Sequence, residues 1–220
     1  MTTGKRGPFR TSLSEVTLGR MGVPKHLFKF SLDDMDDLGL PQRRKVIDYA
    51  KKYVENLDYA FDNNVGICFY GANGVGKSTI ASLIIKEAYR RRYRGKRCTF
   101  TEYINEFSKT WNVAPAEHWG GDDPVGLFYH NYKAVDFLVL EELGKERESE
   151  LALTSLEELL RYREEKGLPT IICTNLHPTK IKERYANSIF SLLRGNFQAI
   201  EVVGSDLRVE KTHDLLNFNS

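Results

Sequence analysis

The residues with the clearest chemistry form one glycine-rich run, Gly71-Ala72-Asn73-Gly74-Val75-Gly76-Lys77-Ser78-Thr79. The run matches the phosphate-binding loop G-x-x-x-x-G-K-[ST], whose glycines let several backbone N–H groups point into one concavity at a helix N-terminus. A triphosphate suits this concavity, since Lys77 would contact the β- and γ-phosphates and Ser78 would place its hydroxyl on Mg²⁺. The sequence therefore predicts a site for ATP and Mg²⁺, with Lys77 as a catalytic residue and Ser78 as a metal ligand. The predicted nucleotide-binding residues in this run are Gly71, Asn73, Gly74, Val75, Gly76, Lys77, Ser78 and Thr79.

Two adjacent carboxylates, Glu141 and Glu142, stand where the strand candidate 135–141 ends. Nucleotide phosphates bind at the carboxyl edge of a parallel sheet, so these acids are expected near the phosphate-binding loop. Glu141 is the predicted Mg²⁺ ligand, through a water molecule, and Glu142 is the predicted base that polarises the attacking water. The alternative is that the two acids only begin a solvated loop.

A third polar position, Asn175, follows the next strand candidate, 169–174. In sheets of this kind that strand lies between the strands that carry the loop and the acids. The Asn175 amide is therefore expected to hold the attacking water or the γ-phosphate by hydrogen bonds, as a catalytic residue. The alternative is an ordinary turn residue at a strand end.

The flanking sequence supplies the strand and the helix that the phosphate-binding loop requires. An apolar run precedes the loop, and apolar residues recur after it at helical spacing. Further strand candidates alternate with helical patterns, which is typical of a parallel sheet covered by helices on both faces. The sequence predicts an α/β P-loop NTPase fold with five parallel strands flanked by helices and no separate C-terminal lid domain. The strand candidates are 65–70, 97–102, 135–141, 169–174 and 198–203.

Two helices and one long connection complete this outline. A helix is predicted from Gln42, with one apolar stripe that extends to Phe61. Residues 103–131 exceed the length of a simple crossover, so a functional insertion is expected there. Another helix follows the third strand and is predicted to stop at Gly167. Its predicted buried face is Leu153, Leu156, Leu159 and Leu160.

Length and charge fit one domain with extensions. The chain has 220 residues, 41% of them hydrophobic, and a net charge of only +2. Residues 1–40 are predicted to be a basic, flexible leader that docks a partner, because their first thirty residues hold six Lys and Arg against one acid. Residues 41–212 are the predicted ATPase domain, and residues 213–220 the predicted tail.

The cysteines and the apolar runs indicate where in the cell the protein is expected. Cys68, Cys98 and Cys173 each fall inside a strand candidate, without the spacing of metal ligands or of a disulfide framework. They are expected to be buried thiols in a reducing environment. No apolar run reaches the roughly 18 residues of a membrane span, and no signal-peptide core is recognisable. A soluble, cytoplasmic protein is expected, without membrane contact.

A cluster of cations lies where the helix after the phosphate-binding loop ends, interleaved with Tyr89 and Tyr93. Such a composition suits contacts with the phosphates and stacked bases of single-stranded DNA. The alternative is that the cations only stabilise the C-terminal end of the helix dipole. The insertion at 103–131 is a second candidate DNA surface. The candidate DNA contacts in the cluster are Arg90, Arg91, Arg92, Arg94, Lys96 and Arg97.

Four segments taken in order, GANGVGKST, VDFLVLEELGKE, IICTNLHPTKI and VVGSDLR, resemble the AAA+ ATPases that load the replicative helicase in bacteria and phages. These are the DnaC and DnaI group and their transposition relative IstB, and the similarity covers about residues 20–208. The resemblance implies an AAA+ RecA-like core, Mg²⁺-dependent ATP hydrolysis and loading of the hexameric replicative helicase onto single-stranded DNA. It also implies ATP-dependent homo-oligomers in a bacterial cytoplasm, or in the host cytoplasm for a phage protein. Asn175 matches the sensor-1 position, and Arg208 matches a nucleotide-binding arginine that resembles sensor 2.

Two departures from the family pattern bear on catalysis. The first acid is usually Asp, whereas Glu141 adds a methylene that moves the carboxylate by about 1.5 Å. The family also tends to have Ser-Arg-Leu before the last strand, with an arginine that reaches a neighbouring subunit's nucleotide. This chain has Ser191-Leu192-Leu193 there, so Arg194 or Arg184 is the candidate arginine finger.

Two other functions stay open at this point. An ATPase that helps DNA transposition, like IstB, would carry the same ordered motifs. A small-molecule kinase would share the phosphate-binding loop, but Asn175 and Arg208 suit an ATP sensor better.

Overall fold

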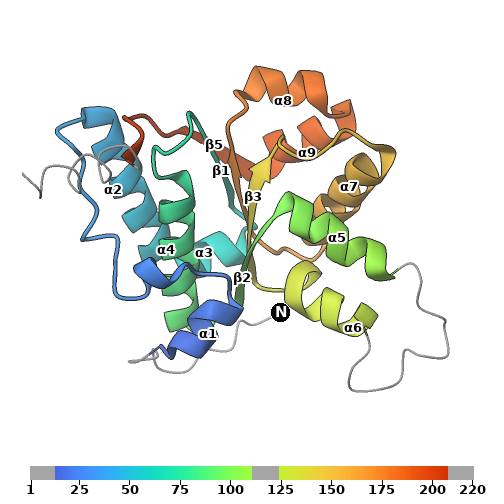
Figure 1. Cartoon of the computed structure of the whole chain (residues 1–220), viewed down its shortest axis with the longest axis horizontal. Helices are drawn as coiled ribbons and strands as arrows, with labels where there is room; N and C mark the ends of the chain where they lie inside the picture. The colour runs from blue at the N-terminus through green and yellow to red at the C-terminus, as the bar shows by residue number, and fades with distance from the viewer. Residues whose placement is uncertain (1–12, 111–123, 208–220) are drawn as a thin grey trace, which may run out of the picture.

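Five parallel strands form the centre of the fold, in the spatial order β2-β3-β4-β1-β5 (Figure 1). The computed structural model describes residues 13–110 and 124–207. The predicted α/β fold with a five-stranded parallel sheet is confirmed. Through residue 207, the described chain forms no separate C-terminal lid domain. The strands are β1 (Gly66–Tyr70), β2 (Gly95–Thr99), β3 (Phe137–Leu143), β4 (Thr170–Thr174) and β5 (Phe197–Glu201).

Helices cover both faces of this sheet, with α1 to α4 on one side and α5 to α9 on the other (Figure 1). The first group is α1 (Glu15–Arg20), the 3-10 turn η1 (Lys25–Leu27), α2 (Pro41–Glu55), α3 (Leu57–Asp62) and α4 (Lys77–Arg90). The second group is α5 (Phe100–Thr110), α6 (Pro124–Phe128), the π-helical turn η3 (Tyr129–Lys133), α7 (Glu150–Glu165), α8 (Pro178–Arg184) and α9 (Asn187–Asn196).

Strand residues alternate between two hydrophobic clusters, one under each helical layer. In β1, Ile67 and Phe69 pack in the cluster under α4, whereas Cys68 packs in the cluster under α7 and α9. Successive side chains of a strand point to opposite faces, so a strand buried on both faces reads as a continuous apolar run. The apolar runs at β1, β3 and β4 were recognisable in the sequence for this reason.

Strand β2 is shorter than predicted, because the chain turns into α5 at Phe100 instead of continuing to residue 102. The Thr99 hydroxyl accepts from the Glu102 N–H at 3.1 Å, and the Glu102 carboxylate accepts from the Thr99 N–H at 2.7 Å. This reciprocal pair is a capping box, which starts a helix. The predicted insertion at 103–131 therefore begins inside α5, and its residues 111–123 lie outside the described residues.

Residues 13–40 are packed against the sheet and against α2 and α4, so the prediction of a flexible leader is wrong for this part of the chain. Leu18, Met21 and Leu27 are buried in the same cluster as β1 and α4. The buried Lys86 of α4 donates to the carbonyls of Leu27 and Phe28, at 3.1 and 3.2 Å. Glycines and prolines divide the segment into short elements without preventing burial. Residues 1–12 and the predicted tail, 213–220, lie outside the described residues.

Helix α7 buries a slightly different face from the predicted one. Leu153 is 38% exposed, and the small residues Ala152 and Ser155 take its place in the interface. The predicted stop at Gly167 is confirmed, since this glycine has a φ of +64° directly after the helix cap. No helix in the described ranges is both long and apolar enough to cross a membrane.

Burial of the cysteines gives a first prediction. All three are buried in strands, and burial raises the pKa of Cys68 and of Cys98 to about 12 and that of Cys173 well above its usual range. Because the thiolate is the reactive form, iodoacetamide at pH 8 should label the folded protein very slowly and label all three thiols after unfolding in urea. Mass spectrometry counts the adducts. Rapid labelling of a folded-state thiol would contradict the assigned burial.

Candidate nucleotide site

The phosphate-binding loop connects β1 to α4, and its glycines are required by geometry. Gly71, Gly74 and Gly76 have φ values of +141°, +75° and +99°. A Cβ on Gly71 would lie 2.3 Å from the Val202 carbonyl oxygen, so a larger residue would clash with backbone there. Helix α4 begins at Lys77, directly after Gly76, which aims the free N–H groups of its first turn at the loop.

Lys77 is only 7% exposed, and its ammonium is held by three oxygen acceptors. It donates to the carbonyls of Gly71, at 2.7 Å, and Ala72, and to Oδ1 of Asn175 at 2.8 Å. The Asn175 amide nitrogen donates in turn to Oδ1 of Asn73, at 2.7 Å. β4 lies between β3 and β1, as predicted, and this order brings Asn175 to the phosphate-binding loop.

The two acids have opposite environments although they are adjacent. Glu141 is only 3% exposed at the lining of the cleft, whereas Glu142 is exposed. Glu142 has a φ of +60°, at a register shift between β3 and β4 that follows Leu140. A non-glycine residue in this region is strained, and such strain concentrates at functional sites. The Lys145 ammonium lies 2.8 Å from Oε1 of Glu142.

The residues around Glu141 fit a Mg²⁺ ion that binds together with nucleotide. Oε2 of Glu141 accepts a hydrogen bond from Arg97, while Oε1 is buried and has no hydrogen-bond partner among the described residues. Ser78 and Thr79 line the same cleft. Within the described chain, no three His, Cys, Asp or Glu side chains gather as a metal site. Mg²⁺ characteristically takes one or two protein ligands and completes its shell with phosphate and water oxygens.

A cleft of about 840 Å³ contains all of these groups. One side is formed by the phosphate-binding loop, the two acids and Asn175, and the other by residues from the segment 24–38. This segment contributes an apolar wall, formed by Pro24, Leu27, Phe30, Met35 and Leu38, and three polar residues, His26, Asp34 and Asp36. A volume of this size with a few convergent polar groups is typical of a nucleotide-sized ligand site.

Arg43 is a site residue that the sequence reading missed. It is buried, and its guanidinium donates to the Val75 carbonyl at 2.7 Å and to the Asp36 carbonyl at 2.8 Å. Arg43 thus joins α2 and the apolar wall to the phosphate-binding loop. The burial of Arg43 could have been recognised in the sequence, because Arg43 lies at helical spacing from Val46 and Ala50 on the buried face of α2.

The basic cluster after α4 differs from the prediction in two residues. Arg97 lies in β2 and binds Glu141 and the Gly22 carbonyl, so it is part of the cleft and not of a DNA surface. Tyr93 is buried against Phe61 and Phe137 and is closed to base stacking.

The other five cations of the cluster stay a prediction as DNA contacts. Arg90 pairs with Glu87, Arg91 donates to the Glu55 carbonyl and Lys96 donates to the Arg20 carbonyl. The Arg91 and Lys96 contacts reach the last carbonyls of α2 and α1, so they stabilise the C-terminal ends of these two helices, whereas the alternative concerned the end of α4. The five cations are Arg90, Arg91, Arg92, Arg94 and Lys96.

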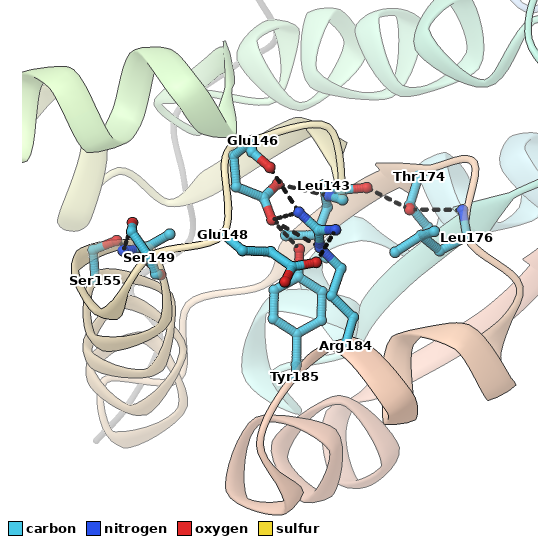
Figure 2. Close-up of polar contacts among 11 residues, drawn as sticks. Leu143, Glu146, Glu148, Ser149, Ser155, Thr174, Leu176, Arg184 and Tyr185 are labelled. Atoms are coloured by element: carbon cyan, nitrogen blue, oxygen red, sulfur yellow. Dashed lines mark hydrogen bonds and ion pairs between the residues drawn. The ribbon is translucent and has the colours of Figure 1, made fainter.

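Arg184 is bound within its own chain, which conflicts with its predicted role as an arginine finger (Figure 2). Its Nη2 donates to the Glu146 carbonyl at 2.6 Å and to Glu146 Oε1 at 3.0 Å, its Nε donates to the same Oε1 at 3.2 Å, and its Nη1 donates to Glu148 at 2.8 Å. The hydroxyl of Tyr185 also donates to Glu146 Oε1, at 2.7 Å. Glu146 Oε2 accepts from the Gly144 N–H at 2.7 Å, so this network fixes the loop that follows Glu142.

Arg194 and Arg208, the other two arginines predicted at the site, have different outcomes. Leu192, at the position of the family's arginine, is a core residue and only 8% exposed. Arg194 is exposed near the end of α9 and makes no ion pair within residues 13–110 and 124–207. It stays a candidate finger. Arg208 lies outside the described residues.

No protein-family model matches the sequence, and no curated protein matches it. Solved structures do resemble the fold. A DnaC helicase loader matches with a TM-score of 0.68 and 18% identity, over 82% of this chain and 100% of that chain. DnaI matches with a TM-score of 0.66 and 23% identity, over 83% of this chain and 96% of that chain.

A longer protein shares the same fold. The replication initiator DnaA, bound to AMPPCP and single-stranded DNA, matches with a TM-score of 0.64 and 20% identity, over 87% of this chain and 56% of that chain. This chain therefore spans about half the length of that protein. These likenesses show that the chain shares its α/β fold with these three proteins.

Two substitutions separate nucleotide binding from hydrolysis. Lys77→Ala removes the only lysine of the loop and should weaken ATP binding by about 10- to 100-fold. Glu142→Gln keeps the shape of the side chain and should keep ATP binding while slowing hydrolysis by on the order of a hundredfold or more. A fluorescent ATP analogue measures the first effect and phosphate release the second. Unchanged hydrolysis in Glu142→Gln would remove Glu142 from the role of base.

Arg184, bound within its own chain, and Arg194, exposed on α9, give a matched comparison of stability. Arg184→Ala would leave Glu146 buried without its cation, and should lower the free energy of unfolding by on the order of 3 kcal/mol. Arg194→Ala, at an exposed position, should change it by less than about 0.5 kcal/mol. Urea denaturation followed by circular dichroism measures both. Equal stability of the two variants would show that the Glu146 network is not structural.

Proposed function

We propose that this chain is a Mg²⁺-dependent ATPase of the helicase-loader type. The observation that carries the nucleotide part is the direct contact between Lys77 and Asn175. It joins the phosphate-binding loop to the end of β4, beside the acids at the end of β3. Three separate strand ends thus converge at one cleft, as phosphate binding and water activation require.

The chain's own residues have distinct proposed roles in hydrolysis. Lys77 is proposed to exchange its carbonyl acceptors for the β- and γ-phosphate oxygens, and Asn175 to orient the attacking water or the γ-phosphate. Ser78 and Glu141 would hold Mg²⁺, which when bound neutralises charge on the phosphates. Glu142, exposed to the cleft, is proposed to accept the proton of the attacking water.

The apolar wall supports a nucleoside triphosphate in preference to a small phosphate ester. Leu27, Phe30 and Met35 line the same cleft as the phosphate-binding loop, and their apolar surface suits burial of a base. Lys86 and Arg43 fix this wall to α4 and to the loop. We therefore propose that backbone and apolar groups of the segment 24–38 bind the base.

The proposed helicase-loader function is based on the solved structures that share this fold. One similar structure is a helicase loader, and another is an initiator bound to AMPPCP and single-stranded DNA. We propose that ATP promotes homo-oligomers that contact a hexameric replicative helicase and single-stranded DNA, in a bacterial or infected-host cytoplasm. Arg194 is the proposed arginine finger between subunits, because it is exposed near a helix end while Arg184 is bound in its own chain.

Helicase capture tests the loader part. The basic residues 1–12 precede the packed segment, so a deletion of 1–12 should spare ATP binding yet abolish capture of the natural host's purified replicative helicase on a column. Lys77→Ala should lose ATP-dependent capture for a different reason. Capture that survives the deletion would place the docking surface on the ATPase domain. Capture of a transposase, with none of the helicase, would favour the transposition helper.

A further inference from the structure

The two carboxylate oxygens of Glu141 are not equivalent. Oε2 accepts from a guanidinium nitrogen of Arg97, and the pair lies in the interior with Arg97 22% and Glu141 4% exposed in their side chains. Oε1 is equally buried, and the described residues offer it no hydrogen-bond partner. A buried carboxylate oxygen without a partner is unfavourable, and in a native fold it points to a ligand or an ordered water.

The register of the sheet explains how Arg97 reaches this carboxylate. Arg97 pairs with Val139 and Thr99 pairs with Glu141 in the parallel β2–β3 ladder. Residues two apart on a strand share a face, so Arg97 and Glu141 are diagonal neighbours on one face of the sheet. Val139 packs in the cluster under α4, which identifies that face as the one beneath the phosphate-binding helix.

Arg97 is held from its other side by the segment that follows α1. Its guanidinium donates to the Gly22 carbonyl at 2.9 Å, and its backbone N–H donates to the Met21 carbonyl at 2.7 Å. Gly22 has a φ of +83°, and a Cβ there would lie 2.3 Å from the Arg97 carbonyl oxygen. The close approach of the two backbones fixes the position of the guanidinium independently of Glu141.

A glutamate needs such a partner more than an aspartate would. Glu has one more rotatable bond, so an unrestrained Glu141 would lose more side-chain entropy when it adopts a single metal-facing conformation. Binding of Oε2 by Arg97 removes that freedom before any ligand arrives. Residues that hydrogen-bond a ligating carboxylate typically contribute 10- to 100-fold to metal affinity or activity.

We propose that Arg97 is a positioning residue, which holds Oε2 of Glu141 so that Oε1 alone is presented to the Mg²⁺ of the bound nucleotide. This inference rests on the proposed nucleotide function and assigns Arg97 to the cleft in place of a DNA surface. The guanidinium also brings a positive charge close to the metal, which would act in the opposite direction. Positioning is the larger of the two effects in this proposal.

A Mg²⁺ titration tests it. Arg97→Met keeps most of the side-chain stem and removes the guanidinium. The Mg²⁺ concentration for half-maximal binding of a fluorescent, non-hydrolysable ATP analogue should rise about tenfold or more, while analogue binding in EDTA stays within about twofold. Arg161→Met, which removes an exposed arginine of α7 outside the cleft, should leave the Mg²⁺ requirement unchanged. A requirement that is unchanged or lower in Arg97→Met would overturn the inference.

A double variant separates positioning from a folding defect. Glu141→Asp needs no partner to limit its conformations, so Arg97→Met with Glu141→Asp should bring the Mg²⁺ requirement back to within about threefold of the parent. Loss of structure in the segment 20–23 would not be repaired by a change at Glu141, and an unrepaired double variant would count against positioning. If the parent chain itself showed no Mg²⁺-dependent nucleotide binding, the proposed function would fail first.

Discussion

The Lys77 ammonium is the group on which the architecture of the site depends. A lysine that is almost withdrawn from water needs oxygen acceptors in place of its hydration, and here they come from the loop carbonyls and from Asn175. Asn175 can reach Lys77 only because β4 is the neighbour of β1. The sheet order, the glycine conformations of the loop and the polar end of β4 therefore belong to one arrangement, which holds the ammonium at the lining of the cleft.

The other groups of the cleft are fixed by long-range contacts around that centre. Arg43 ties α2 to the loop, Lys86 ties the apolar wall to α4, and Arg97 ties the segment after α1 to Glu141. Each is a cation that is buried or mostly buried and bonded to backbone carbonyls or a carboxylate. The Arg184 and Glu146 network does the same for the loop after Glu142 (Figure 2). The buried cations thus hold the elements of the site together. The exposed cations after α4 remain candidate DNA contacts.

The residues that the sequence correctly placed together in one cleft were recognisable from short local patterns. The phosphate-binding loop, the acids after an apolar strand and Asn175 at the next strand end each depend on a few consecutive residues and on strand order. The role of Arg97 could not be read in this way, because it stands among six cations and only strand alternation separates it from Lys96. The packing of residues 13–40 was not predicted, because the glycines and prolines in this segment interrupt the spacing of its apolar residues. The capping box of Thr99 and Glu102 was present in the sequence and marks the end of β2.

A crystal structure with a non-hydrolysable ATP analogue and Mg²⁺ would show whether the cleft binds a nucleotide in the proposed way. We expect the triphosphate in the loop, the Lys77 ammonium on β- and γ-phosphate oxygens and the base between the loop and the segment 24–38. We also expect Glu141 with one oxygen on Arg97 and the other facing the metal shell. A nucleotide bound elsewhere, or a Lys77 that keeps all three of its present acceptors beside a bound triphosphate, would contradict this mode of binding.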